Sequence, residues 1–141
     1  MLSEFQGSCH CGAIGFSYRT SIAPERWSIR ACQCSFCRAH DTLSTSDPAG
    51  SLEFTASDPD LLNRYRFGLR TADFLLCREC GIYIGALIET GKGRFGIISM
   101  HALVEAPENL AATEPISYDS EDIAERVSRR ETRWTPVKTN L

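Results

Sequence analysis

Seven cysteines, gathered in three short stretches, constrain this chain more than any other feature of its sequence. The middle stretch, residues 32–37 (CQCSFC), places three thiols close together among mostly small or polar neighbours. The pair Cys9 and Cys11 precedes this triplet, and the pair Cys77 and Cys80 follows it. A triplet of this density can turn its three sulfurs toward one point, so that a metal ion bound there would keep one coordination position free.

The cellular compartment decides whether grouped thiols form disulfides or bind metals. The first residues, MLSEFQG, have neither the basic region nor the apolar core of a secretory signal. We therefore expect a cytoplasmic protein in which thiols stay reduced. No stretch approaches the roughly 18 consecutive apolar residues of a membrane-spanning helix, so we expect no membrane partner. Clustered cysteines in such a compartment are more often metal ligands or redox groups than structural bridges.

Length and charge narrow the class of protein further. A chain of 141 residues with 43% hydrophobic content fits one compact domain, and we predict a single domain over residues 1–141. The formal net charge of -3 makes the chain a poor candidate for binding the phosphate backbone of nucleic acids. Small molecules or protein partners are the ligands that this composition favours.

The hydrophobic pattern predicts a mainly β, antiparallel domain. Apolar residues alternate with small or polar ones over several short segments that end at proline, glycine or aspartate, as half-buried strands do. The most apolar run, residues 82–88, is predicted to be a central strand, and the turn at residues 90–93 joins it to residues 94–100 as a hairpin. The other predicted strands are residues 14–19, 27–31, 51–56, 62–67 and 74–76.

A single helix is predicted near the carboxyl end, over residues 120–133. Ser120 is the expected cap, acidic residues follow in the first turn, and arginines gather toward the end of the segment. Because its apolar content is thin, we expect this helix to lie loosely on the surface. Its arginines alternate with acidic residues, which favours a solvated face over a binding site. These arginines are Arg126, Arg129, Arg130 and Arg133.

The thiols favour zinc, although their spacing does not assign them to particular ions. All-thiolate tetrahedral sites suit zinc better than copper or iron, while an iron–sulfur cluster is also compatible with the spacing. In one division the two outer pairs share an ion and the triplet holds another. In the other, Cys34 and Cys37 join the pair that follows them, which leaves Cys32 with the first pair. Both divisions give one set of four ligands and one of three.

Three blocks of the sequence resemble the signature blocks of the glutathione-dependent formaldehyde-activating enzyme and centromere protein V family. They are residues 7–12 (GSCHCG), 32–38 (CQCSFCR) and 74–81 (FLLCRECG), and they occur in that family's order. With the strands between them they cover a core of about residues 5–104, which leaves residues 105–141 as a tail. The resemblance implies an Mss4-like antiparallel β fold that binds two zinc ions per chain.

The resemblance also implies roles for the cysteines and a reaction. The structural zinc ligands would be Cys9, Cys11, Cys77 and Cys80, and the catalytic zinc ligands would be Cys32, Cys34 and Cys37. The reaction would be that of a carbon–sulfur lyase similar to S-(hydroxymethyl)glutathione synthase, with glutathione or a similar small thiol and formaldehyde or another aldehyde as substrates. Gln33 stands where the family often has histidine, and Phe36 occupies a place that is often acidic or polar, so the rim of the site differs.

Charge and coordination supply further expectations. A zinc ion held by three thiolates carries a net charge of about -1, and a bound substrate thiolate would bring it to about -2. We therefore expect cations nearby, and Arg30, Arg38 and Arg78 are the best placed in sequence to contact the thiol substrate. His40 is expected to be a solvated loop residue.

The alternative from another functional class is a non-catalytic zinc module that binds a protein partner. A purely structural protein would favour closed four-ligand sites, and the seventh cysteine, with no visible eighth ligand, favours an open catalytic site. A thiol redox enzyme would need a free attacking cysteine, and the proposed division of ligands leaves none.

Overall fold

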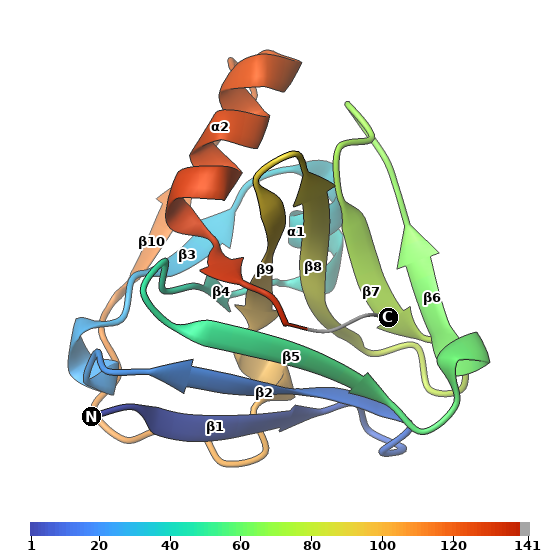
Figure 1. The fold of residues 1–141 in the computed structure, drawn as a ribbon, viewed down its shortest axis with the longest axis vertical. Helices are drawn as coiled ribbons and strands as arrows, with labels where there is room; N and C mark the ends of the chain where they lie inside the picture. The colour runs from blue at the N-terminus through green and yellow to red at the C-terminus, as the bar shows by residue number, and fades with distance from the viewer. Residues whose placement is uncertain (139–141) are drawn as a thin grey trace.

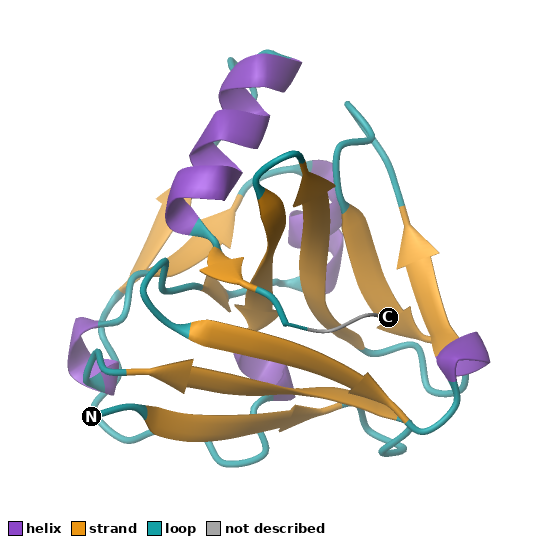
Figure 2. Ribbon diagram, viewed as in Figure 1, coloured by secondary structure: helices purple, strands orange, loops and turns teal. Residues whose placement is uncertain are grey.

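The computed structural model describes residues 1–138, and strands make up most of its regular structure (Figures 1 and 2). A small antiparallel sheet has the order β1–β2–β5 and contains β1 (Ser3–Ser8), β2 (Ile14–Thr20) and β5 (Ser51–Ala56). In Figure 1 these strands run across the direction of the larger sheet behind them. The amino-terminal strand β1 was not among the predicted strands, because Phe5 is its one large apolar residue.

The larger sheet has the order β10–β3–β4–β9–β8–β7–β6, and β11 adds to it by pairing with β9. Its pairings are antiparallel except for β10 with β3, which run parallel. The mainly β, antiparallel fold predicted from the sequence is therefore confirmed. The strands are β3 (Ile29–Cys32), β4 (Ser44–Thr45), β6 (Leu62–Tyr65), β7 (Asp73–Cys77), β8 (Tyr83–Thr90), β9 (Gly93–Ser99), β10 (Thr113–Ile116) and β11 (Thr135–Pro136).

In the described part of the chain two α-helices interrupt the strands, α1 (Ser35–His40) and α2 (Ile123–Arg133). Single 3₁₀ turns occupy η1 (Pro24–Arg26), η2 (Pro59–Leu61) and η3 (Met100–Ala102). Within residues 1–138, no helix has the length and apolar content needed to cross a membrane.

Two hydrophobic cores lie on opposite faces of the larger sheet. The first core fills the space against the small sheet, and its largest fully buried side chains include Phe16, Tyr18 and Phe54. The second core contains Phe36 of α1, Phe74 and Trp134. Strand β8 contributes to both, which is why nearly its whole length is apolar. The predicted central strand and its hairpin with β9 are thus confirmed, with Thr90 opposite Gly93 at the turn.

The carboxyl-terminal helix differs from the prediction at its start. Asp122, rather than Ser120, is the cap, because its carboxylate accepts the Glu125 N–H at 2.8 Å while the Glu125 carboxylate accepts the Asp122 N–H at 3.1 Å. This reciprocal capping box satisfies two backbone donors that the helix itself leaves unpaired.

As expected, this helix lies on the surface, with Arg130 as its one buried residue, but its carboxyl end is anchored rather than loose. Trp134 and Thr135, which follow it directly, are buried, and Thr135 pairs with Gly96 of β9. The next backbone groups bond to neighbouring strands, since Val137 N–H donates to Arg94 and Lys138 N–H donates to Leu52. Residues 134–138 therefore anchor the carboxyl end of α2 to strands β9 and β5.

Candidate functional site

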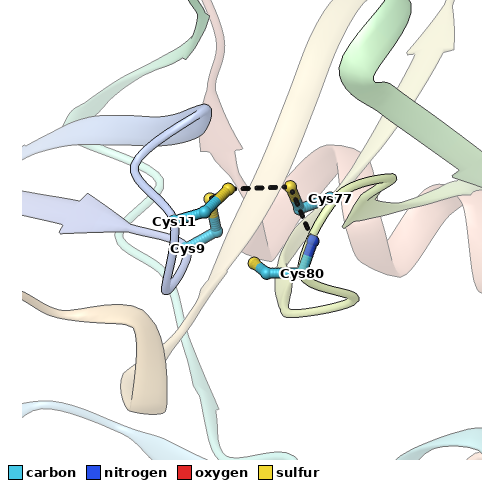
Figure 3. Close-up of side chains that lie close together, drawn as sticks. All are labelled: Cys9, Cys11, Cys77 and Cys80. Carbon is cyan, nitrogen blue, oxygen red and sulfur yellow. Dashed lines mark hydrogen bonds between the residues drawn. The ribbon is translucent and has the colours of Figure 1, made fainter.

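Four cysteines from two corners of the fold meet at one point (Figure 3). Cys9 and Cys11 lie in the corner between β1 and β2, and Cys77 and Cys80 lie at the end of β7. The four sulfurs all lie within 4.8 Å of one another. The cluster therefore joins the small sheet to the large one through residues that are more than sixty positions apart in sequence.

Both corners have the same local construction. In each, a glycine with positive φ, Gly12 or Gly81, allows a tight turn that follows the cysteines. In each, a backbone N–H points at the sulfur of the first cysteine, from Ile14 to Cys9 at 3.4 Å and from Cys80 to Cys77 at 3.5 Å. Such donors stabilise a thiolate, which is the form that binds metals.

The spacing of these sulfurs fits a tetrahedral metal ion. A zinc–sulfur bond of about 2.3 Å places the sulfurs of a tetrahedral site about 3.8 Å apart. The Cys9 and Cys11 sulfurs are 3.7 Å apart, and the Cys11 and Cys77 sulfurs are 3.5 Å apart. The donor set and its dimensions therefore suit a closed four-thiolate site.

A second cluster forms from the triplet. Cys32 ends β3, Cys34 is the residue that caps α1, and Cys37 lies in the first turn of that helix. Their three sulfurs also lie within 4.8 Å of one another, and among residues 1–138 no further cysteine, histidine or carboxylate joins the group. Of the two divisions that spacing allowed, the structure has the one in which the outer pairs meet and the triplet stands by itself.

The thiols of the triplet are strongly coupled to one another. Hydrogen bonds with Cys32 and Cys37 hold the pKa of the Cys34 thiol well below its ordinary value. Contacts with Cys32 and Cys34 raise the pKa of the Cys37 thiol. The Cys37 backbone N–H also donates to the Cys34 sulfur at 3.4 Å. Three sulfurs this close favour a shared negative charge, which a bound cation would neutralise.

A cavity of about 100 Å³ opens beside the triplet, and all three of its cysteines line it. Its opposite wall is formed by α2 and the loop before it. Apolar lining comes mainly from Phe67, Phe74, Ile97 and Trp134. The four basic residues that line it are Arg30, Arg126, Arg129 and Arg130.

These arginines have different partners. Arg126 and Arg129 both bond to the Glu121 carboxylate, Arg129 through two nitrogens at 2.7 and 3.0 Å. This pairing lowers the pKa of Glu121, chiefly through its hydrogen bonds with Arg129. The guanidinium carbon of Arg129 also lies 3.5 Å from the centre of the Tyr118 ring, a cation–π contact.

Among residues 1–138, no such carboxylate pairs with Arg130 or Arg30. Arg130 is buried, bonds through one nitrogen to the Thr71 hydroxyl at 2.7 Å and lies over the Trp134 ring. Arg30 donates to the Ser46 hydroxyl at 2.7 Å. Burial lowers the pKa of both guanidiniums, that of Arg130 to about 10.

Of the three arginines that were expected to contact the thiol substrate, the structure places one at the cavity and two elsewhere. Arg30 lines the cavity beside the triplet. Arg38 is exposed on α1, and Arg78 is exposed at the four-cysteine corner; neither lines the cavity. His40 belongs to α1 rather than to a loop, and its ring stacks on Phe36 with the centroids 4.2 Å apart.

The arginines of α2 are the site residues that sequence reasoning missed. Acidic neighbours favoured a solvated stripe, yet only Glu121 pairs with these arginines. Asp122 and Glu125 cap the helix instead, and Glu131 accepts a hydrogen bond from Thr90. The sequence signal that could have revealed the site is the pair Trp134 and Thr135 directly after the helix, since both residue types favour strands. In the structure these residues are buried, and Thr135 pairs with β9, which anchors α2 to the sheet.

Comparison with a solved structure supports the fold. A crystal structure of a Rhodobacter sphaeroides protein aligns with a TM-score of 0.55 and 24% sequence identity, and the alignment covers 77% of this chain and 99% of that one. At this level of identity the likeness concerns the fold alone.

A comparison with protein families identifies the sequence pattern. The family model described as glutathione-dependent formaldehyde-activating enzyme matches residues 4–119, which include both cysteine clusters and exclude α2. Since the match spans most of the chain, the protein belongs to the glutathione-dependent formaldehyde-activating enzyme family.

Proposed function

We propose that this protein is a zinc-dependent carbon–sulfur lyase that forms or cleaves the adduct of a small thiol with an aldehyde. Glutathione and formaldehyde are the substrates that its family suggests. The observation that supports this most is the three-cysteine cluster facing a cation-lined cavity, next to a separate four-cysteine cluster. We propose one zinc ion for each cluster, structural at the four cysteines and catalytic at the triplet.

The reaction balances without an oxidant or a reductant. The thiol loses its proton, its sulfur bonds to the aldehyde carbon as the carbonyl π bond breaks, and the oxygen gains a proton to become a hydroxyl. Cleavage of the adduct is the same step reversed. Cys32, Cys34 and Cys37 would hold the zinc ion with one position open, and the ion would supply a lowered pKa to a substrate thiol bound there.

The residues of the chain support this reaction in three ways. Cys32, Cys34 and Cys37 supply three thiolates and hold one side of the cavity open. The guanidiniums opposite favour the accumulation of negative charge when the substrate thiol ionises, because opposite charges attract strongly in a partly buried site. Phe74 and Trp134 remove water from part of the wall, which strengthens those interactions further.

Of the three arginines expected to contact the thiol, Arg30 has the position that this role requires. Arg38 and Arg78 provide a contrast, because both are exposed and neither lines the cavity. We propose that the Arg30→Gln variant binds the thiol more weakly while zinc binding persists, and that Arg38→Gln and Arg78→Gln have little effect. Unchanged thiol affinity in Arg30→Gln would contradict this role.

The decisive assay is exchange spectroscopy of glutathione with formaldehyde, with and without the zinc-loaded protein. The protein should accelerate exchange between free glutathione and its hydroxymethyl adduct, and Cys34→Ser should remove the acceleration. Native mass spectrometry provides the control, because Cys34→Ser should lose one of two zinc ions and remain folded. Exchange at the spontaneous rate with fully zinc-loaded protein would favour the non-catalytic zinc module.

A further inference from the structure

Two of the arginines that line the cavity have no acidic partner in the part of the chain that the structure describes. Within residues 1–138, ion pairs join Arg126 and Arg129 to Glu121, but none joins Arg30 or Arg130 to a carboxylate. The side chains of Arg30 and Arg130 reach hydroxyl groups instead, on Ser46 and Thr71. Both guanidiniums therefore retain unused capacity to bind an anion.

Arg130 is the more unusual of the two. It is 8% exposed, and its Nε has no hydrogen-bond partner in the described part of the chain, although it is buried. A buried donor left unpaired costs stability, and a buried charge without a counter-charge costs more. The Trp134 ring and the Thr71 hydroxyl hold the guanidinium in place despite this loss of stability. A ligand that supplies an anion would offset it.

The triplet cannot neutralise the whole of this positive charge. Four guanidiniums line the cavity, Asp119 lines it too, and Glu121 pairs with Arg126 and Arg129, so the two carboxylates leave an excess of two positive charges. A zinc ion with three thiolate ligands would contribute a charge of about -1. One positive charge then remains, and a substrate thiolate would balance it, so a carboxylate would be held by direct contacts with Arg30 and Arg130 rather than by excess charge.

The size of the cavity limits what reaches these arginines. An apolar cavity of about 150 Å³ holds a benzene ring, so a space of about 100 Å³ accommodates a compact group of a few atoms. A carboxylate is such a group, and the planar fork of a guanidinium matches its two oxygens.

We propose that Arg30 and Arg130 bind the carboxylate of the thiol substrate beside the triplet, so that this protein selects acidic thiols over neutral ones. The inference rests on the proposed function, because it assumes that the thiol occupies the triplet. It concerns a feature of this chain in particular: Arg130 lies on α2, outside residues 4–119 that match the family.

The test compares two thiols of nearly the same shape, 3-mercaptopropionate and 3-mercaptopropanol. Titration calorimetry with the full-length, zinc-loaded protein measures their binding in the absence of any aldehyde, so the result does not depend on turnover. Since hydrogen bonds to charged groups contribute a few kcal/mol, we expect the acid to bind about 10-fold to 100-fold more tightly than the alcohol.

Variants separate recognition of the carboxylate from overall charge. Arg130→Gln should reduce the preference for the acid to within about twofold, because the acid loses far more affinity than the alcohol, and Arg130→Lys should retain part of the preference. The control Arg133→Gln removes the same charge from an exposed position on the same helix, which does not line the cavity, and should preserve the preference. Arg30→Gln gives a second test if Arg130→Gln unfolds, which thermal melting detects.

Three outcomes would overturn the proposal. Equal binding of the two thiols, no binding of either, or equal losses in Arg130→Gln and Arg133→Gln would show that the arginines only offset the charge of the triplet or support the fold. A preference for the acid together with no acceleration of adduct formation would instead refute the lyase function and leave the anion site standing.

Discussion

The two cysteine clusters should contribute very differently to stability, because they close chain segments of very different length. The variant pairs to compare are Cys9→Ser with Cys77→Ser, which breaks the four-cysteine cluster, and Cys32→Ser with Cys37→Ser, which breaks the triplet. Serine is nearly isosteric with cysteine, so each pair removes thiolate ligands with little change in packing volume.

The expected magnitudes follow from the positions of the residues. Cys9 and Cys77 are 68 positions apart (77 − 9), and treated as a cross-link their connection through a metal ion restricts the unfolded chain by about 4 kcal/mol. The triplet spans residues 32–37 alone, and the same relation gives about 2 kcal/mol. The first pair of substitutions should thus lower the free energy of unfolding by about 2 kcal/mol more than the second.

Urea unfolding at a fixed free zinc concentration measures the difference, with fluorescence of the buried Trp27 and Trp134 as the probe. The midpoint should fall further for the Cys9 and Cys77 pair at an unchanged slope. Equal losses for the two pairs, or a larger loss for the triplet pair, would refute the interpretation of the four-cysteine cluster as the clasp between the sheets.

Three further predictions concern the scaffold. Asp47 is 2% exposed, and its carboxylate accepts hydrogen bonds from the Thr20 hydroxyl at 2.6 Å and the Ala49 N–H at 2.9 Å. Asp47→Ala should therefore lower the free energy of unfolding in urea by about 3 kcal/mol, whereas Asp60→Ala, at an exposed position, should lower it little. An equally small loss in both variants would contradict this. A Cβ at Gly7 would overlap the buried Phe16 ring, so Gly7→Ala should lower the free energy of unfolding by about 1–3 kcal/mol. Gly91 has open space around it, so Gly91→Ala should change that free energy little. A near-zero change in Gly7→Ala would refute the close packing. Asp122→Ala should destabilise the protein by about 1 kcal/mol through loss of the capping box and Ser120→Ala should not, as thermal melting can show; the reverse order would restore Ser120 as the cap.

The sequence was sufficient for the features that depend on local spacing. The cysteine clusters, the turns after Cys11 and Cys80, and the β8–β9 hairpin all follow from residues that are neighbours in the chain or that alternate along a strand. The assignment of each thiol to a cluster could not be predicted from the sequence. Spacing allowed two divisions, and the distinction depends on the corner of the small sheet approaching the end of β7, which is a tertiary contact.

The cation-lined wall was beyond sequence reasoning for a physical reason. An arginine among acidic residues on a helix is solvated by default, and its environment changes only if the helix is fixed against another element. Here β11 fixes α2 by pairing with β9, and the parallel pairing of β10 with β3 places Tyr118 near the triplet. Both pairings join segments far apart in sequence, and neither strand has the alternating apolar pattern that predicts one.

The central claim is that the triplet is an open metal site that accepts the thiol substrate, whereas the four-cysteine cluster is closed. Cobalt in place of zinc tests it directly, because cobalt bound by thiolates absorbs in the visible and near-ultraviolet range and the spectrum responds to each added sulfur ligand. Addition of 3-mercaptopropionate to the cobalt-loaded protein should strengthen the sulfur-to-cobalt absorption. The Cys32→Ser, Cys37→Ser variant should show no such change, since its remaining cobalt occupies the closed site. A spectrum that does not respond to the thiol in the wild-type protein, or that responds equally in the variant, would contradict the claim.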